Sequence, residues 1–293
     1  MKADLYICSE TFSHNGIDSI IDVTRKLSSF QMMLEKIVEH QDDNTLYVDQ
    51  KDFVSIAIFN DGKSINDILS DYQTSIAVYG KDVLTLLFSI FKRCNNASVC
   101  LDDMKAYLDI EDESNCNAII VLNPLKGYEE HVQVLSNIGS WFIFRREYLA
   151  RYPVDQHFFL TETKKYFPNL CIHEKTKTTL KDVLYSHPRR IVTYLSILND
   201  FLIPEFTSNV GLDFVAFLSW FASKHNLDGA SFEGKKDDKF IFTFPDGTKA
   251  YCEPHLKMHK DDAGNQNQHC RIYFKSPKNS DKMVYIGCIC QHL

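Results

Sequence analysis

Apolar residues follow two spacings along the first 150 residues, and their alternation predicts an α/β domain. Runs rich in β-branched and aromatic residues predict strands at DLYIC (4–8), TLYVD (45–49), FVSIAIF (53–59), SIAVYG (75–80) and NAIIVLNP (117–124). Apolar residues at helical spacing predict helices at SSFQMMLEKIVEH (28–40), SINDILSDY (64–72) and DVLTLLFSIFKRC (82–94). Strands that alternate with helices favour a sheet with parallel pairing.

The pattern changes around Pro153. WFIFRREYLARYP (141–153) predicts a strand that runs into a short helix, which must stop before the proline. Apolar residues three and four positions apart then predict a mainly helical stretch over 155–226. From Gly229 the pattern turns to β, and Asp246-Gly247 within KFIFTFPDGTKAYCEP predicts a hairpin because this pair tolerates positive φ angles. RIYFKS and KMVYIGCIC predict two further strands.

We therefore expect an α+β protein in three parts. Residues 1–150 form an α/β domain, residues 151–226 a helical connecting segment, and residues 227–293 an antiparallel β module. A chain of 293 residues exceeds the usual size of a single hydrophobic core, which favours more than one domain.

Charge is distributed unevenly along the chain. The formal net charge is −7, which disfavours binding of a polyanion by the whole surface. However, residues 211–293 carry 11 Lys and Arg against 10 Asp and Glu, whereas residues 1–210 carry 21 against 29. We expect any RNA or other polyanion to bind at the C-terminal module, and any protein partner to bind the N-terminal domain.

Composition also bears on the cellular location. The start of the chain has no apolar run of signal-peptide length, and the longest apolar stretches are too short to span a bilayer. Nine cysteines at irregular spacings favour reduced thiols. We expect a cytoplasmic protein that does not enter a membrane.

The last forty-odd residues hold the main concentration of reactive side chains, and one hypothesis for them is a zinc site. Cys252, His255 and His259 have spacings compatible with ligands, and Cys288, Cys290 and His292 could complete a tetrahedron. Against zinc, paired Cys-x-x-Cys knuckles are missing. Strand alternation instead predicts one core-facing row of buried free thiols with apolar neighbours, namely Val284, Ile286, Cys288 and Cys290, with Tyr285, Gly287 and Ile289 opposite.

The second hypothesis for this region is RNA cleavage without a metal. That reaction needs a group to take the 2′-hydroxyl proton, a cation to stabilise the phosphorane, and an acid for the leaving oxygen. Lys257, Arg271 and His292 can fill these roles, with His255 or His259 as an alternative acid or base. Each of these residues could instead be a solvated or paired surface charge. The catalytic hypothesis requires that they share one hollow.

The segments CEPHLKMH, RIYF and VYIGCICQHL resemble the ending of bacterial proteins associated with defence and toxin genes. A helix followed by an antiparallel sheet with a strand-borne Arg is also similar to the RelE and ParE toxin family. The resemblance covers about residues 210–293. It implies ribosome-dependent messenger RNA cleavage, with Lys257 and Arg271 as the phosphate-binding cations and His292 as the proton-transfer group. The chain departs from that family because some 210 acidic-biased residues precede the module.

The leading hypothesis from the sequence is a bacterial defence or toxin-like effector whose C-terminal module binds or cleaves RNA without metal. The alternative is a non-enzymatic interaction protein with a structural C-terminal module, with or without zinc.

Overall fold

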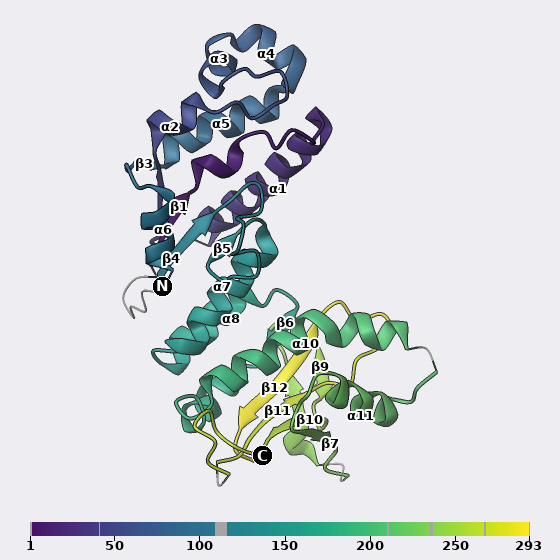
Figure 1. Ribbon diagram of the computed structural model, residues 1–293. Coiled ribbons are helices and arrows are strands. Elements are labelled where there is room, and N and C mark those ends of the chain that lie inside the picture. Colours follow the sequence, from purple (N-terminus) through teal and green to yellow (C-terminus); the bar gives the residue numbers. More distant parts are fainter. Residues whose placement is uncertain are drawn as a thin grey trace. The chain divides into compact units, whose positions relative to one another are not determined.

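The chain forms two compact units, residues 1–144 and 145–293 (Figure 1). The computed structural model describes residues 2–40, 42–108, 116–209, 211–234, 237–266 and 268–292. Both units combine helices with a five-stranded sheet, so the predicted α+β class is confirmed. The helical stretch that the sequence set apart as 151–226 lies in the same unit as the C-terminal sheet. No helix in the described ranges combines the length and apolar composition that a membrane crossing requires.

The N-terminal unit is built on a parallel sheet, as the alternation of strands and helices predicted. Its strand order is β3-β2-β1-β4-β5, and every neighbouring pair is parallel. Central strand β1 is almost wholly buried, which fits its apolar sequence. The strands are β1 (Ala3–Ile7), β2 (Thr45–Val48), β3 (Asn95–Asn96), β4 (Cys116–Ile120) and β5 (Val134–Leu135).

Side-chain caps set where several helices of this unit begin. Ser19 and Asp22 form a capping box, so α1 starts before the predicted Ser28. Ser64 and Asp67 form a second box at α3. The helices are η1 (Ser9–Phe12), α1 (Ile20–Glu39), α2 (Gln50–Ser55), α3 (Ile65–Ser70), α4 (Tyr72–Tyr79), α5 (Lys81–Arg93), α6 (Leu101–Tyr107) and α7 (Ile138–Arg151), which crosses the division between the units.

Three expected strands are wrong. Residues 53–59 contain the end of α2, and residues 75–80 lie largely in α4. The strand expected to begin at residue 141 is part of helix α7. In α7, Trp141 and Phe144 are fully buried three positions apart, which is a helical spacing. Short apolar runs fit both a buried strand and one face of a helix. At residues 53–59 the helix is favoured by Asp49, whose side chain accepts a hydrogen bond from the N–H of Asp52 and so caps α2.

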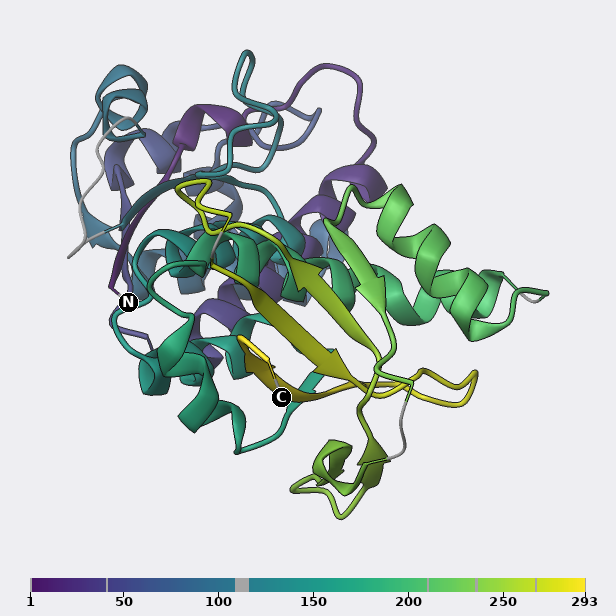
Figure 2. The ribbon, with the colours of Figure 1, turned by 90° about the horizontal axis from the view of Figure 1, so that it is seen from below.

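The C-terminal unit is built on a mixed sheet with strand order β6-β12-β11-β10-β7 (Figure 2). Strands β7, β10, β11 and β12 are antiparallel, as predicted for the module, whereas β6 pairs in parallel with β12. The strands are β6 (Leu170–Ile172), β7 (Gly229–Ser231), β10 (His255–Met258), β11 (Cys270–Phe274) and β12 (Val284–Cys290). Strands β6, β7 and β10 were not predicted.

Helices and a hairpin cover this sheet. The expected hairpin is confirmed, and β8 (Ile241–Thr243) and β9 (Lys249–Tyr251) form a separate two-stranded sheet. Its Phe242, Phe244 and Cys252 pack with Tyr273 and Cys288 of the main sheet. The helical elements are α8 (Gln156–Tyr166), α9 (Thr176–Thr179), η2 (Leu180–Asp182), α10 (Pro188–Ser208), α11 (Phe214–Lys224) and η3 (Asp238–Phe240).

Strand β12 contains a bulge at Gly287. Tyr273 pairs with Cys288, but the next residue of β11, Phe274, pairs with Ile286, so Gly287 is an extra residue on β12. The expected row of Val284, Ile286, Cys288 and Cys290 is therefore wrong. Before the bulge Tyr285 packs toward the hairpin, and after it Cys288 and Cys290 do so. Both thiols still share one face, as predicted.

A methyl group at Gly287 should destabilise the C-terminal unit. A Cβ there would lie 2.6 Å from Cε2 of Phe242 and 2.8 Å from Cβ of Cys252, and both side chains are buried. Overpacking of this kind costs about 1–3 kcal/mol. We expect Gly287→Ala to lower the urea midpoint of unfolding accordingly. Gly211→Ala is the matched control, because no heavy atom lies within 4 Å of its Cβ; equal midpoints for the two variants would contradict this packing account.

Candidate functional site

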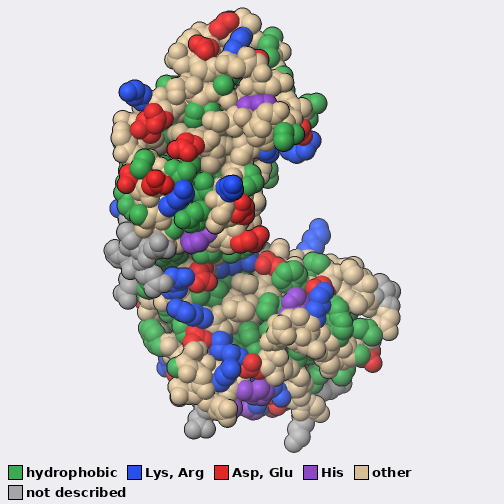
Figure 3. Space-filling model, viewed as in Figure 1, with side chains coloured by type: hydrophobic (Ala, Val, Ile, Leu, Met, Phe, Trp, Pro, Cys, Tyr) green, Lys and Arg blue, Asp and Glu red, His purple; other side chains and the backbone are tan. Residues whose placement is uncertain are grey.

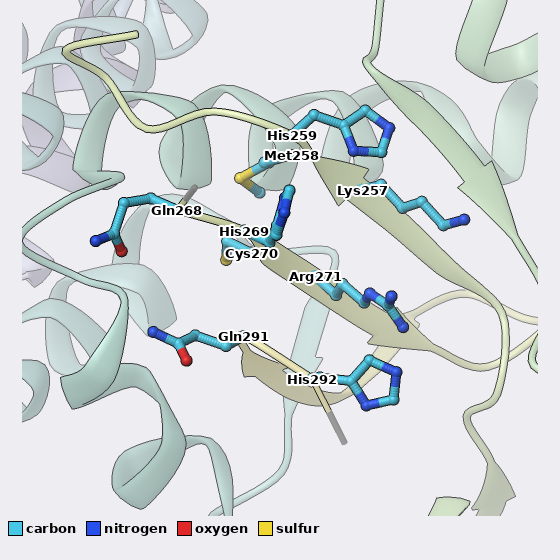
Figure 4. A pocket seen from close by; sticks show the side chains of 9 residues that line it. All are labelled: Lys257, Met258, His259, Gln268, His269, Cys270, Arg271, Gln291 and His292. Atoms are coloured by element: carbon cyan, nitrogen blue, oxygen red, sulfur yellow. The ribbon is translucent and has the colours of Figure 1, made fainter. Parts of the chain in front are cut away.

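A hollow of about 520 Å³ opens where β10 and β12 end and β11 begins (Figure 4). We call it the strand-end hollow. Its walls carry three imidazoles and two permanent cations, and Lys257, Arg271 and His292 extend in the same direction from neighbouring strands. In the space-filling view, His and Lys or Arg side chains gather where the chain ends (Figure 3). The lining residues are Lys257, Met258, His259, Gln268, His269, Cys270, Arg271, Gln291 and His292.

Sheet register explains why the cations meet. Lys257 on β10 is paired with Arg271 on β11, and directly paired residues of antiparallel strands project to the same face. Arg271 is paired in turn with Cys290 on β12, and His292 lies two residues further. Among the described residues, Lys257 Nζ has no hydrogen bond or ion pair, so its charge is available to a ligand.

Four side chains converge on one carboxylate oxygen beside the hollow. Oε1 of Glu233 lies 2.7 Å from Nη1 of Arg271 and accepts a hydrogen bond of 3.0 Å from the Tyr273 hydroxyl. Nε2 of His255 lies 3.8 Å and Nε2 of His292 lies 3.9 Å from the same oxygen. The side chains of Glu233 and Arg271 are each 23% exposed, so a ligand can reach the pair.

The electrostatics of this cluster keep Glu233 ionised. Burial alone would raise the pKa of Glu233, but the hydrogen bond from Tyr273 and the charges of neighbours such as Arg271 lower it below the usual value. At neutral pH the carboxylate is therefore an acceptor of hydrogen bonds and protons.

His255 is held in one tautomer under this cluster. Its Nδ1 lies 3.1 Å from the carbonyl oxygen of Glu253, which can only accept, so Nδ1 carries the proton. Burial lowers the pKa of His255 to about 4, so the ring is neutral near pH 7. Its Nε2 then accepts the hydroxyl proton of Ser231 at 3.0 Å. The ring is 1% exposed, which places it beneath the site and out of reach of solvent.

His259, Gln268 and His269 line one wall of the hollow, and the segment that follows β10 is anchored at His259 and Asp262. The backbone N–H of His259 donates to Asp228, and Asp262 accepts the N–H groups of Arg189 and Arg190 at the start of α10. A helix N-terminus favours such an anion. The hydroxyl of Tyr194 on α10 donates to the carbonyl of Lys257. Helix α10 therefore positions both β10 and the start of the segment that follows it.

The three candidate zinc ligands have separate surroundings. Cys252 is fully buried in the hairpin core, where burial raises its pKa to about 12. His255 faces Ser231 and Glu233, and His259 lines the hollow. Over the described ranges, no three His, Cys, Asp or Glu side chains are grouped closely enough to hold a metal ion.

Sequence reasoning selected most of the cluster and missed two members. Lys257, Arg271 and His292 share one hollow, and His255 lies against the same carboxylate. Tyr273 could have been found, because it is two residues from Arg271 in a strand and so shares its face. Glu233 could not, because it follows the unpredicted strand β7 and meets Arg271 only through pairing of three strands.

Neutral His255 should make stability depend on pH in a defined window. Its pKa is about 4 in the folded chain against about 6.5 when unfolded, so between these values only the unfolded chain takes up the proton. Stability is therefore complete above pH 6.5 and falls as the pH falls toward 4. We expect a loss of about 2 kcal/mol between pH 7.5 and pH 5 from this group.

Urea unfolding at these two pH values measures that loss. His255→Gln should remove the pH-dependent part, whereas His157→Gln, on the exposed surface of α8, should retain it. The assignment fails if the His255→Gln chain loses as much stability at pH 5 as the unchanged chain does.

Comparison with family models, with curated proteins and with solved structures finds no match to this chain. A function must therefore be argued from the geometry of the strand-end hollow and the Glu233 cluster.

Proposed function

We propose that the C-terminal unit binds RNA in the strand-end hollow and cleaves it without a metal, as a toxin-like or defence effector of a bacterial cytoplasm. The observation that carries the proposal is the convergence on Glu233: the Arg271 guanidinium and the exposed His292 imidazole both lie within 4 Å of its Oε1. The carboxylate is the proposed base, the guanidinium the phosphate-binding cation and the imidazole the acid. The nine cysteines are all free thiols, which supports a reducing compartment.

The reaction assigned to these groups is an internal transesterification. Glu233 takes the proton of a ribose 2′-hydroxyl, and the 2′-oxygen forms a bond to phosphorus. The bond from phosphorus to the 5′-oxygen breaks, and the imidazolium of His292 donates its proton to that oxygen. The products are a 2′,3′-cyclic phosphate and a 5′-hydroxyl, so DNA is not a substrate.

The cations hold the phosphate during this step. Charge on the non-bridging oxygens increases in the phosphorane, and preorganised donors stabilise that increase. The described hydrogen bonds of Arg271 use only Nη1, which leaves Nη2 for a phosphate oxygen. Lys257, the neighbour of Arg271 across the strand pair, can contact the same phosphate or the next one. Because these contacts are between cations and phosphates, the affinity for RNA should fall as the salt concentration rises.

Tyr273 and His255 position the carboxylate and do not transfer protons. The Tyr273 hydroxyl donates to Oε1 of Glu233 and so fixes one oxygen, leaving Oε2 for the substrate. Neutral His255 fills the space beneath and fixes Ser231. This division differs from the sequence hypothesis, in which His255 was an alternative acid or base.

Cleavage of a labelled single-stranded RNA in the presence of EDTA tests the proposal. We expect Glu233→Gln and His292→Ala each to lower the rate about 10²–10⁴-fold, as is typical for loss of a general base or acid. Arg271→Ala and Lys257→Ala should weaken RNA binding as well, and should reduce its dependence on salt. Lys249→Ala removes an exposed cation of β9 in the same unit and should leave both rate and binding unchanged.

Three results would count against the proposal. One is cleavage of the matched DNA, another is RNA binding that survives Arg271→Ala and Lys257→Ala together, and the third is activity that needs an added divalent metal. Binding without cleavage would instead favour the non-enzymatic interaction protein.

A further inference from the structure

A second hollow, of about 430 Å³, adjoins the strand-end hollow and shares two of its lining residues. The shared residues are His259, just after the end of β10, and His269, just before the start of β11 (Figure 4). We call this second space the imidazole hollow, and Asp228, Lys260 and Gln266 complete its lining. Its volume is within the range of small-molecule sites. Two adjoining hollows can hold two successive groups of one extended ligand.

The strand register aligns the shared imidazoles with the cations of the strand-end hollow. Lys257 is paired with Arg271; His259 follows Lys257 by two residues, and His269 precedes Arg271 by two. Residues two apart in an extended chain share a face. The ring centroids of His259 and His269 lie 6.1 Å apart, with an angle of 86° between the ring planes. A ligand that extends from the two cations in this direction therefore meets both rings.

Both rings are available to a planar ligand. His259 and His269 are exposed, and within the described ranges neither imidazole has a hydrogen bond or an ion pair. Because the rings are perpendicular, the ring that contacts its neighbour with an edge keeps both of its own faces free of that neighbour. A nucleobase in the corner can stack on one ring while its edge meets the other. Proteins bind unstacked bases of single-stranded RNA on aromatic side chains, histidine included.

The charges around the imidazole hollow suit the phosphate that follows such a base. Lys260 is exposed and has no ion pair among the described residues. The carboxylate of Asp228 is held by the guanidinium of Arg190 and accepts a hydrogen bond from the backbone N–H of His259. Its negative charge is therefore compensated within the chain. The charge that remains for a ligand is the positive charge of Lys260, which attracts an anion.

The position of Glu233 decides which nucleotide of the substrate lies here. Glu233 contacts Arg271 together with Tyr273, which lies two residues after Arg271, whereas His269 lies two residues before it. In the proposed reaction Glu233 must reach the 2′-hydroxyl of the nucleotide that precedes the scissile phosphate. The 5′-oxygen leaves from the opposite side of phosphorus, because attacking and leaving oxygens lie in line. The leaving nucleotide therefore extends toward His269.

We propose that the imidazole hollow is the subsite for the nucleotide that follows the scissile phosphate, with its base against the His259 and His269 rings and its 3′-phosphate against Lys260. This inference rests on the RNA cleavage proposed above. His259 is here a substrate-binding residue and transfers no proton, in contrast to the sequence hypothesis.

Two substrates that differ only in the leaving group separate this subsite from the catalytic groups. A dinucleoside monophosphate carries a leaving nucleoside, whereas a nucleoside 3′-methyl phosphate has no base to stack. We expect His259→Ala with His269→Ala to lower kcat/KM about tenfold for the dinucleotide, as is typical for loss of one base stack, and to leave the methyl ester unchanged. His157→Ala, which removes an exposed imidazole of α8, is the matched control and should change neither.

Lys260→Ala tests the second contact of the subsite. It should leave cleavage of the dinucleotide unchanged, because that substrate has no phosphate after the leaving nucleoside. It should weaken binding of longer RNA and reduce the salt dependence by about one phosphate contact. An equal effect of Lys260→Ala on the dinucleotide would contradict this assignment.

A 2′-O-methyl oligonucleotide, which cannot be cleaved by this reaction, keeps the two proposals apart. If the unchanged chain binds it but cleaves no RNA, the cleavage proposal fails. The subsite is then tested by binding alone, which His259→Ala with His269→Ala should weaken about tenfold. Equal losses of kcat/KM for the dinucleotide and the methyl ester would overturn the subsite, as would unchanged binding in the double variant or no binding by the unchanged chain.

Discussion

The close approach of the hairpin to β12 at Gly287 determines which side chains can form the candidate site. Only a residue without a Cβ fits beneath the Phe242 ring, and the extra residue shifts the alternation of everything that follows. Without that shift, the positions after the bulge would exchange faces, and His292 would lie on the opposite side from Arg271. The distance of 3.9 Å between Nε2 of His292 and Oε1 of Glu233 thus depends on one backbone irregularity, which lies against Phe242 of the hairpin. Packing in the hairpin core and geometry of the site are two consequences of the same contact.

A second constraint is the compensation of a partly buried carboxylate. Burial disfavours the charged form of Glu233, and the Tyr273 hydroxyl and the Arg271 guanidinium, which donate to the same oxygen, help to lower its pKa below the usual value. A phosphate that enters the hollow competes for the same donors, since its oxygens are also anionic acceptors. In the proposed reaction, substrate binding would therefore weaken the hold of Arg271 on Glu233 and make the carboxylate a stronger base when a base is needed. The ion pair is in this sense a resting state of the site.

The sequence was sufficient for features that depend on neighbouring residues. The hairpin at Asp246-Gly247, the strands around Tyr6 and Tyr273 and the parallel character of the first sheet all follow from local spacing and turn chemistry. Residues 75–80 show the limit, because a short apolar run has no internal feature that separates a strand from a helix face. Period-two spacing also failed at Gly287, where the bulge is imposed by a residue far away in the chain.

The candidate site was predicted in its cations and imidazoles because those residue types are chemically conspicuous. Its carboxylate was not, because Glu233 is one of many acidic residues in the chain, and only the pairing of β7, β10 and β11 distinguishes it. The sequence also could not show which of His255 and Lys257 faces the hollow. The two residues lie two positions apart on β10, yet Lys257 lines the hollow, whereas His255 is 1% exposed and lies beneath Glu233.

The net charge of a protein is a poor guide to the charge of the ligand that one of its sites can bind. Charges more than about 10 Å apart are largely screened at ordinary salt, so a ligand responds to the groups that line its own site. Around the strand-end hollow the acidic residues are already engaged: Asp228 by Arg190 and a backbone N–H, Asp262 by the start of α10, and Glu233 by Arg271. Lys257 has no such partner within the described chain, so the outward field of the hollow is positive although the whole protein is negative. A site can therefore attract a ligand whose charge has the same sign as the whole protein, provided that the charges opposing that ligand are paired within the site.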